Sequence, residues 1–170
     1  AAGAIAQPAN LKDIELRGAT VLDATSVAAL KAQYVGRSVD VEDLAEILRK
    51  VNELYQDQGY VTSGATLPDQ TMVDGKLVIN AVESSLGAIN VNGEGRIADG
   101  NIIAALRRDN PGPLNVNALK ASFGRLERAR HIRNLRGQLV PAGAQGKSAL
   151  NLTVTEAPDT FDLSVAVNNY

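Results

Sequence analysis

The chain has 170 residues, of which 45% are hydrophobic and 21% charged, and its formal net charge is −2. This composition is typical of a folded globular protein and excludes a disordered chain. The absence of cysteine excludes disulfides, thiolate metal sites and cysteine nucleophiles, and the absence of an apolar run of ~20 residues excludes a membrane helix.

The first predicted elements are a lead-in, a strand and a helix. Residues 1–10 are small and polar and predict a flexible lead-in. Ile14 and Leu16 place apolar side chains at alternate positions, which is typical of a half-buried strand. Asp23 or Thr25 is expected to cap the first helix, because either side chain can accept a hydrogen bond from an unpaired backbone N–H.

A second helix and two strands complete the first half. Asp40 is placed to cap the helix, and apolar residues at helical spacing follow it as far as Gly59, whose lack of a side chain suits a helix end. Residues 60–67 are expected to be extended. After a turn that begins at Pro68, residues 77–82 alternate as a returning strand.

The second half predicts the same order of elements. A strand at 89–91 precedes a helix marked by apolar residues at 102–106, and two prolines then break that helix. Asn115 is expected to cap the next helix. Residues 132–140 and 149–155 are expected to form the closing hairpin.

The two halves are therefore copies of one unit. Most of the matched positions lie 75 residues apart and the last lie 73 apart: Ile14/Ile89, Leu16/Val91, Gly18/Gly93, Asp40/Asn115, Leu44/Leu119, Val51/Leu126 and Glu83/Glu156. Such a repeat implies two small α+β domains, expected at 11–84 and 85–158. Because only Ser84 and Ser85 separate their strands, we expect a nearly fixed angle between them.

Residues 159–170 have a different pattern. From Phe161 to Val167 the odd positions are apolar and the even positions are small or polar. A strand of a transmembrane barrel has this alternation, with lipid on one side and the lumen on the other. An ordinary half-buried strand that opens a third repeat unit has it too. On either interpretation the chain ends within a strand.

The sequence gives little support for an enzyme. His131 is the only histidine, so no second histidine or cysteine can complete a metal-ligand set. There is no Gly-x-Ser-x-Gly nucleophile motif and no phosphate-binding loop. We expect a protein that is not an enzyme and uses no cofactor or metal.

The charges are divided unevenly between the halves. Residues 1–85 hold 7 basic and 12 acidic side chains, whereas residues 86–170 hold 10 and 7. A solvated surface explains the basic residues, and contact with an acidic partner or with the cell envelope is the alternative. Nucleic acid is excluded, because aromatic residues are scarce among them and the pI is about 5.4. The candidate contact residues are Lys120, Arg125, Arg128, Arg133 and Arg136.

Sheet edges offer a second kind of binding site. A small sheet exposes much of its edge, where unpaired N–H and C=O groups can pair with an extended polypeptide. One segment is β-prone, uncharged and free of proline, whereas Arg133 and Arg136 on the later strand are of the kind that discourages pairing. The candidate binding residues are therefore Tyr60, Val61, Thr62, Ser63, Gly64 and Ala65.

Several motifs together resemble a known family, over about residues 11–170. They are Tyr55-x-x-x-Gly59-Tyr60-Val61-Thr62, Leu67-Pro68-x-Gln70, Gly75-x-Leu77-x-Ile79, Leu139-x-Pro141-x-Gly143, Gly146-x-Ser148-x-Leu150 and Val167-x-Asn169-Tyr170. The chain resembles the POTRA domains of two-partner-secretion outer-membrane transporters. These transporters are the hemolysin-activator and filamentous-hemagglutinin-transporter branch of the Omp85 superfamily.

The resemblance implies a fold, a location and a function. Two tandem POTRA domains, each a β-α-α-β-β unit with its third strand central, would precede the first strand of an outer-membrane β-barrel. They would lie in the periplasm as a monomeric fragment, capture the unfolded secretion domain of a partner exoprotein, and pass it to the barrel without a cofactor. The alternatives are a POTRA pair from a general barrel-assembly factor, or a module that binds peptidoglycan or anionic lipid.

Overall fold

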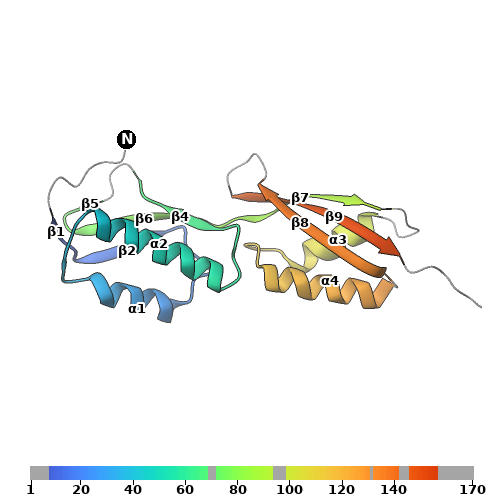
Figure 1. The fold of residues 1–170 in the computed structure, drawn as a ribbon, viewed down its shortest axis with the longest axis horizontal. Helices are drawn as coiled ribbons and strands as arrows, with labels where there is room; N and C mark the ends of the chain where they lie inside the picture. Colours follow the sequence, from blue (N-terminus) through green and yellow to red (C-terminus); the bar gives the residue numbers. More distant parts are fainter. Residues whose placement is uncertain (1–7, 69–71, 94–98, 131, 142–145, 157–170) are drawn as a thin grey trace, which may run out of the picture.

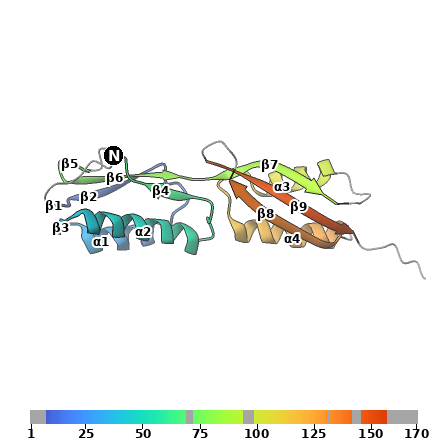
Figure 2. The same ribbon diagram turned by 45° about the horizontal axis from the view of Figure 1, so that its top comes forward.

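The computed structural model describes residues 8–68, 72–93, 99–130, 132–141 and 146–156. These residues form two units that lie end to end along the long axis of the molecule (Figure 1). In each unit a small sheet lies on one side and two helices on the other, and the helices of both units lie on the same side (Figure 1); Figure 2 shows this layering most plainly for the first unit. The prediction of an α+β fold is confirmed.

The first unit contains a four-stranded sheet and a small two-stranded ladder. Its central strand is β6, which pairs in parallel with β2 and antiparallel with β4. The short β5 also pairs with β6, and β1 pairs with β3 in a separate two-stranded ladder. The elements are β1 (Ala9–Asn10), β2 (Asp13–Arg17), α1 (Ala24–Tyr34), β3 (Ser38–Val39), α2 (Val41–Asp57), β4 (Gly64–Thr66), β5 (Met72–Val73) and β6 (Lys76–Val82).

The second unit repeats this topology with longer strands. Its order is β7-β9-β8, with β9 central, parallel to β7 and antiparallel to β8. The expectation of a central third strand is thus confirmed in both units. The elements are β7 (Ser85–Asn92), α3 (Asp99–Asp109), α4 (Val116–Arg130), β8 (Ile132–Pro141) and β9 (Lys147–Glu156).

Each unit has its own apolar core between sheet and helices. In the first unit, Ile47, Val51 and Tyr55 of α2 are fully buried against the sheet. The predicted caps are present. The Asp23 carboxylate accepts a hydrogen bond from the N–H of Ser26 (2.9 Å), and Asp40 forms a reciprocal capping box with Asp43.

Two expectations about local structure need correction. Ala9 and Asn10, expected in the flexible lead-in, form β1. Residues 60–63, expected to be extended, form a turn instead, because α2 ends in a left-handed Gly59 (φ +89°) and the N–H of Tyr60 turns back to the C=O of Tyr55 (2.8 Å).

Other expectations fall on residues whose structure is not described. His131 and the predicted barrel strand at 159–170 lie outside the described residues. No helix in the described ranges is both long enough and apolar enough to cross a membrane.

Candidate functional site

The edge of the first sheet that the sequence predicts as a binding site is short and occupied. Only Gly64 and Ala65 of the predicted segment belong to β4. The carboxamide of Asn52, on α2, accepts a hydrogen bond from the N–H of Ala65 (2.8 Å) and donates one to its C=O (3.3 Å). Asn52 therefore occupies both outward backbone groups of Ala65, as a neighbouring strand would.

The remaining predicted residues form a turn that is held from both sides. The N–H of Ser63 donates to the C=O of Tyr60 (2.9 Å), and the hydroxyl of Ser63 accepts from the N–H of Ser84 (2.9 Å). Val61 is half exposed, but it points from a turn rather than from a strand. Tyr60–Ser63 consequently presents no strand edge to a partner.

Two of the other edges are also partly blocked. On β2, the N–H of Ile14 donates to the carboxylate of the preceding Asp13 (2.8 Å) and so is unavailable to a partner. On β7, the register shifts at a bulge between Leu86 and Ile89, and Arg107 of α3 donates to the C=O of Gly87 (2.8 Å). Bulges and charged side chains are common ways to prevent strand addition.

The edge of β8 is the longest and the least obstructed. The N–H of Leu135 donates to the carboxylate of Glu127 on α4 (2.9 Å), which shows that this N–H points away from β9. Because outward groups alternate along a strand, Gly137 and Leu139 also direct their N–H and C=O groups outward. Within the described ranges, no hydrogen bond fills the outward N–H of Gly137 or Leu139.

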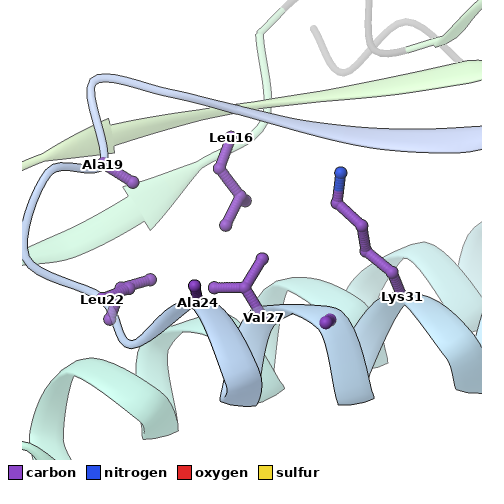
Figure 3. Close-up of a pocket in the computed structure, with 7 residues that line it drawn as sticks. Leu16, Ala19, Leu22, Ala24, Val27 and Lys31 are labelled. Atoms are coloured by element: carbon purple, nitrogen blue, oxygen red, sulfur yellow. The ribbon is translucent and has the colours of Figure 1, made fainter.

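A shallow groove of about 390 Å³ lies between β2 and α1 (Figure 3). Leu16 points into it from the strand and Val27 points into it from the helix, while the Lys31 side chain closes one end. Lys31 is neutralised there by Asp13, 3.1 Å away. Apart from that lysine, the lining side chains are apolar: Leu16, Ala19, Leu22, Ala24, Val27 and Ala28. The groove thus suits small apolar side chains rather than a charged ligand.

The Glu83 carboxylate links three segments of the first unit by hydrogen bonds. It accepts hydrogen bonds from the backbone N–H groups of Thr20 (2.6 Å) and Val21 (3.0 Å), from the Thr20 hydroxyl, and from the buried Tyr55 phenol (3.0 Å). Burial alone would raise the pKa of Glu83, but the hydrogen bonds from Thr20, Val21 and Tyr55 outweigh it and lower that pKa. Burial and the contact with Glu83 raise the pKa of Tyr55, so its phenol remains a donor. The role of Glu83 is structural.

The candidate basic residues do not lie on one surface. Arg125 is paired with Asp109 (2.8 Å). Lys120 and Arg128 are exposed on α4, on the helical side of the sheet. Arg133 and Arg136 are exposed on β8, and Arg136 lies on the sheet face that is turned away from the helices. The five residues concerned are Lys120, Arg125, Arg128, Arg133 and Arg136.

The helices of the two units meet end to end. The side-chain amide of Asn115, the cap of α4, donates to the C=O of Gln58 at the end of α2 (2.9 Å), and the N–H of Val116 donates to the C=O of Gly59 (2.9 Å). The same Asn115 accepts hydrogen bonds from the first turn of its own helix. The negative end of the α2 dipole therefore faces the positive end of the α4 dipole, which favours the contact.

The strands are joined at the same junction. The C=O of Ser84 accepts from the N–H of Leu114 (2.7 Å), and the buried hydroxyls of Ser84 and Ser148 are hydrogen-bonded (2.7 Å). The N–H of Ser85 donates to the C=O of Gly146 (3.0 Å). These contacts give a physical basis for the nearly fixed angle that the short link predicts.

Among the described residues, no group of three or more His, Cys, Asp or Glu side chains is placed to hold a metal ion. The structural features available for binding are therefore backbone edges, shallow grooves and polar faces.

Comparison with known proteins finds similarity to POTRA domains and to outer-membrane transporters. Residues 9–84 match the family of ShlB-type POTRA domains. The chain is 25% identical over 159 residues to the outer membrane transporter CdiB of Dickeya dadantii, covering 94% of this chain and 28% of that protein. It is also 25% identical over 73 residues to the heme/hemopexin transporter protein HuxB of Haemophilus influenzae, covering 43% of this chain and 13% of that protein.

Solved structures show the same fold. POTRA1–3 of Omp85 from Anabaena superposes with a TM-score of 0.71 at 18% identity, over 87% of this chain and 66% of that one. CdiB from Escherichia coli superposes with a TM-score of 0.68 at 22% identity, over 90% of this chain and 28% of that one.

The comparisons confirm the recognition of ShlB-type POTRA structure related to two-partner-secretion transporters. POTRA domains of such transporters lie on the periplasmic side of the outer membrane, so the predicted location is confirmed as well. The chain spans under a third of the length of the curated relatives it matches.

Proposed function

Since residues 9–84 are a ShlB-type POTRA domain, we propose that the chain is the periplasmic substrate-recognition module of an outer-membrane protein transporter. Residues 85–158 form its second POTRA domain. The module binds an unfolded segment of a secreted partner protein by strand addition and passes it to the barrel pore of the transporter. It uses no nucleotide or cofactor.

The observation that carries this proposal is the open edge of β8. A polypeptide that has not yet folded has unpaired backbone groups along its whole length, and an edge strand can pair with them whatever the side chains are. The outward groups of Gly137 and Leu139 offer such a template next to α4. Similar backbone pairing at the other edges would first have to displace a side chain.

Within the segment Tyr60–Ala65, only the residues of β4 can form a further contact with cargo. The strand β4 (Gly64–Thr66) can pair with cargo only after the Asn52 side chain releases the backbone of Ala65. We therefore assign first contact to β8 and treat the β4 edge as a second contact that opens when Asn52 rotates away.

The junction suits a relay between two domains. Hydrogen bonds from Asn115 and Val116 to the end of α2 hold the units in one orientation. The edge of β4 in the first unit and the edge of β8 in the second therefore keep one relative position, so a segment bound on β8 lies at a constant distance from the second contact. A fixed geometry helps transfer, because the receiving site does not have to search for the bound segment.

Disulfide cross-linking tests this function. The chain has no cysteine, so Gln138→Cys on β8 and Thr66→Cys on β4 each introduce one thiol. The cargo probe is the secretion domain of the exoprotein encoded beside the transporter gene, with single cysteines at successive positions. Strand addition predicts that Gln138→Cys cross-links at every second cargo position, because alternate side chains face opposite sides of a sheet.

Two outcomes would overturn the proposal. Equal cross-linking at consecutive cargo positions would show contact without strand pairing. Equal affinity for unrelated unfolded barrel proteins would favour a general barrel-assembly factor instead of a dedicated secretion module.

A further inference from the structure

The outer face of the second sheet, turned away from the helices, carries a regular set of polar side chains. Strand pairing places residues of β8, β9 and β7 side by side, so that each row crosses all three strands. We call this set the polar grid. Its first row is Gln138, Asn151 and Asn90, and its second row is Arg136, Thr153 and Asn92.

The polar grid lines a shallow concavity of about 700 Å³. The amide of Asn90 donates to the side-chain oxygen of Asn151 (2.8 Å), which orients both groups and leaves their other donors and acceptors facing out. No side chain that lines the concavity is apolar. A ligand here would be recognised by hydrogen bonds from amide and hydroxyl groups.

Arg136 gives the polar grid a single charge. Its guanidinium donates to the side-chain oxygen of Asn134 (3.1 Å), and within the described ranges it has no carboxylate partner. Arg125, by contrast, is paired with Asp109. A guanidinium that lacks a carboxylate partner is suited to bind one from a ligand in a two-pronged contact.

The equivalent face of the first unit has other chemistry. There Glu15 is paired with Arg17 (2.7 Å) and with Lys76 (3.3 Å), and Val78 is buried. Its charges are already satisfied within the protein. The polar grid is therefore a property of the second unit and not of the fold.

We propose that the polar grid binds an anionic glycan, namely a polysaccharide whose sugar rings carry carboxylates. Amide and hydroxyl side chains match sugar hydroxyls and acetamido groups, and Arg136 matches the carboxylate. A lipid surface fits less well, since membrane attachment needs apolar side chains or a cluster of several basic residues and the grid has neither. In the periplasm, peptidoglycan strands from which amidases have removed the peptides supply such a ligand, because their muramic acid residues carry free carboxylates.

The test uses glycan strands of peptidoglycan from which an amidase has removed the peptides, so that each muramic acid has a free carboxylate. Chitin oligosaccharides of matched length are the ligand control, because they have the same linkage and acetamido groups without the carboxylate. Calorimetry with the 170-residue chain should show binding to the glycan strands only. Arg136→Gln should weaken that binding about tenfold or more, the effect of losing a charge-assisted hydrogen bond.

Matched variants separate the polar grid from general charge. Asn151→Val replaces the central amide by a side chain that favours strands, and this variant should also bind the glycan strands more weakly. Arg133→Gln removes the same charge from the same strand outside the concavity and should leave the affinity within about twofold. Circular dichroism checks that each variant is folded.

Equal losses from Arg133→Gln and Arg136→Gln would overturn the proposal, because they would indicate diffuse electrostatic attraction. Binding to chitin oligosaccharides as tight as to the glycan strands would overturn the role of the carboxylate. Binding to phosphatidylglycerol vesicles without binding to glycan strands would assign this face to the membrane instead.

Discussion

Asn52 and Glu127 lie 75 residues apart at equivalent positions of α2 and α4, and each makes a hydrogen bond to the edge strand of its unit. The difference lies in what the two side chains can bind. An amide donates and accepts, so Asn52 occupies both the N–H and the C=O of Ala65. A carboxylate only accepts, so Glu127 occupies the N–H of Leu135 and leaves its C=O to a partner. The repeat thus carries one closed edge and one open edge.

Replacing Asn52 should open the first edge. Asn52→Ala removes both hydrogen bonds to Ala65 and should lower the free energy of unfolding by about 1 kcal/mol, because water can replace part of what is lost. The same variant should speed hydrogen exchange of the Ala65 amide, which can be followed by NMR. It should also increase cross-linking of cargo to Thr66→Cys.

Asn52→Asp is the matched control for this prediction. It keeps an acceptor for the N–H of Ala65 and removes only the donor, so the exchange rate of that amide should stay near the wild-type value. An unchanged rate in Asn52→Ala would contradict the assignment of Asn52 as the group that closes this edge.

Glu83 should make the stability of the first unit depend on pH. Its pKa in the folded protein lies below the ordinary value of 4.5, so its contribution to stability is fully present above that value and is lost as the pH falls through the folded pKa. Denaturant titrations between pH 3 and pH 7 should show that the wild-type chain loses stability at the acid end. The loss should extend over about one pH unit on either side of the folded-state pKa of Glu83.

Glu83→Gln tests the origin of that dependence. The amide can no longer ionise, so the variant should be less stable than wild type at neutral pH and should lose less stability on acidification. Tyr55→Phe removes one donor to the carboxylate and should reduce the acid-dependent loss without abolishing it. Parallel curves for wild type and Glu83→Gln would contradict this account of the Glu83 contacts.

The junction can be tested with two glycines that have nearly the same positive φ. Replacing either Gly59 (φ +89°) or Gly36 (φ +88°) by alanine should lower the free energy of unfolding by about 1 kcal/mol or more, because a residue with a side chain disfavours this backbone region. At Gly59 the new Cβ would also lie 2.8 Å from the side chain of Asn117 and 2.9 Å from that of Asn115, whereas at Gly36 it would meet nothing.

Gly59→Ala should therefore cost more stability than Gly36→Ala and should also change the angle between the units. Residual dipolar couplings measured on both variants report that angle. If both variants keep the wild-type angle, the contacts between α2 and α4 are not what holds the units in place.

Local patterns in the sequence predicted the elements that depend on local properties. The alternation at Ile14 and Leu16 predicted β2, and Asp40 predicted the start of α2, because periodicity and capping act over a few residues. The segment 60–63 was predicted wrongly as extended. Its β-prone residues follow the left-handed Gly59, and the return of the Tyr60 N–H to Tyr55 outweighs their local preference.

The functional features depend on contacts between distant residues, which single positions do not reveal. Glu83 was recognised as the counterpart of Glu156, but its hydrogen bonds to Thr20 span 63 residues. Asn52 gave a weak signal, since a polar residue recurs at the same place in both copies as Glu127. Which edge each of them covers depends on where α2 and α4 pack, and that follows from the tertiary fold.

Hydrogen exchange of β8 in the presence of cargo tests the central claim most directly. The secretion domain of the partner exoprotein is added to the labelled chain, and amide exchange is read residue by residue by NMR. Strand addition predicts slowed exchange at Gly137 and Leu139, whose N–H groups point outward, and little change at Gln138, whose N–H already pairs with β9. Binding of the secretion domain with unchanged exchange at both Gly137 and Leu139 would contradict the claim.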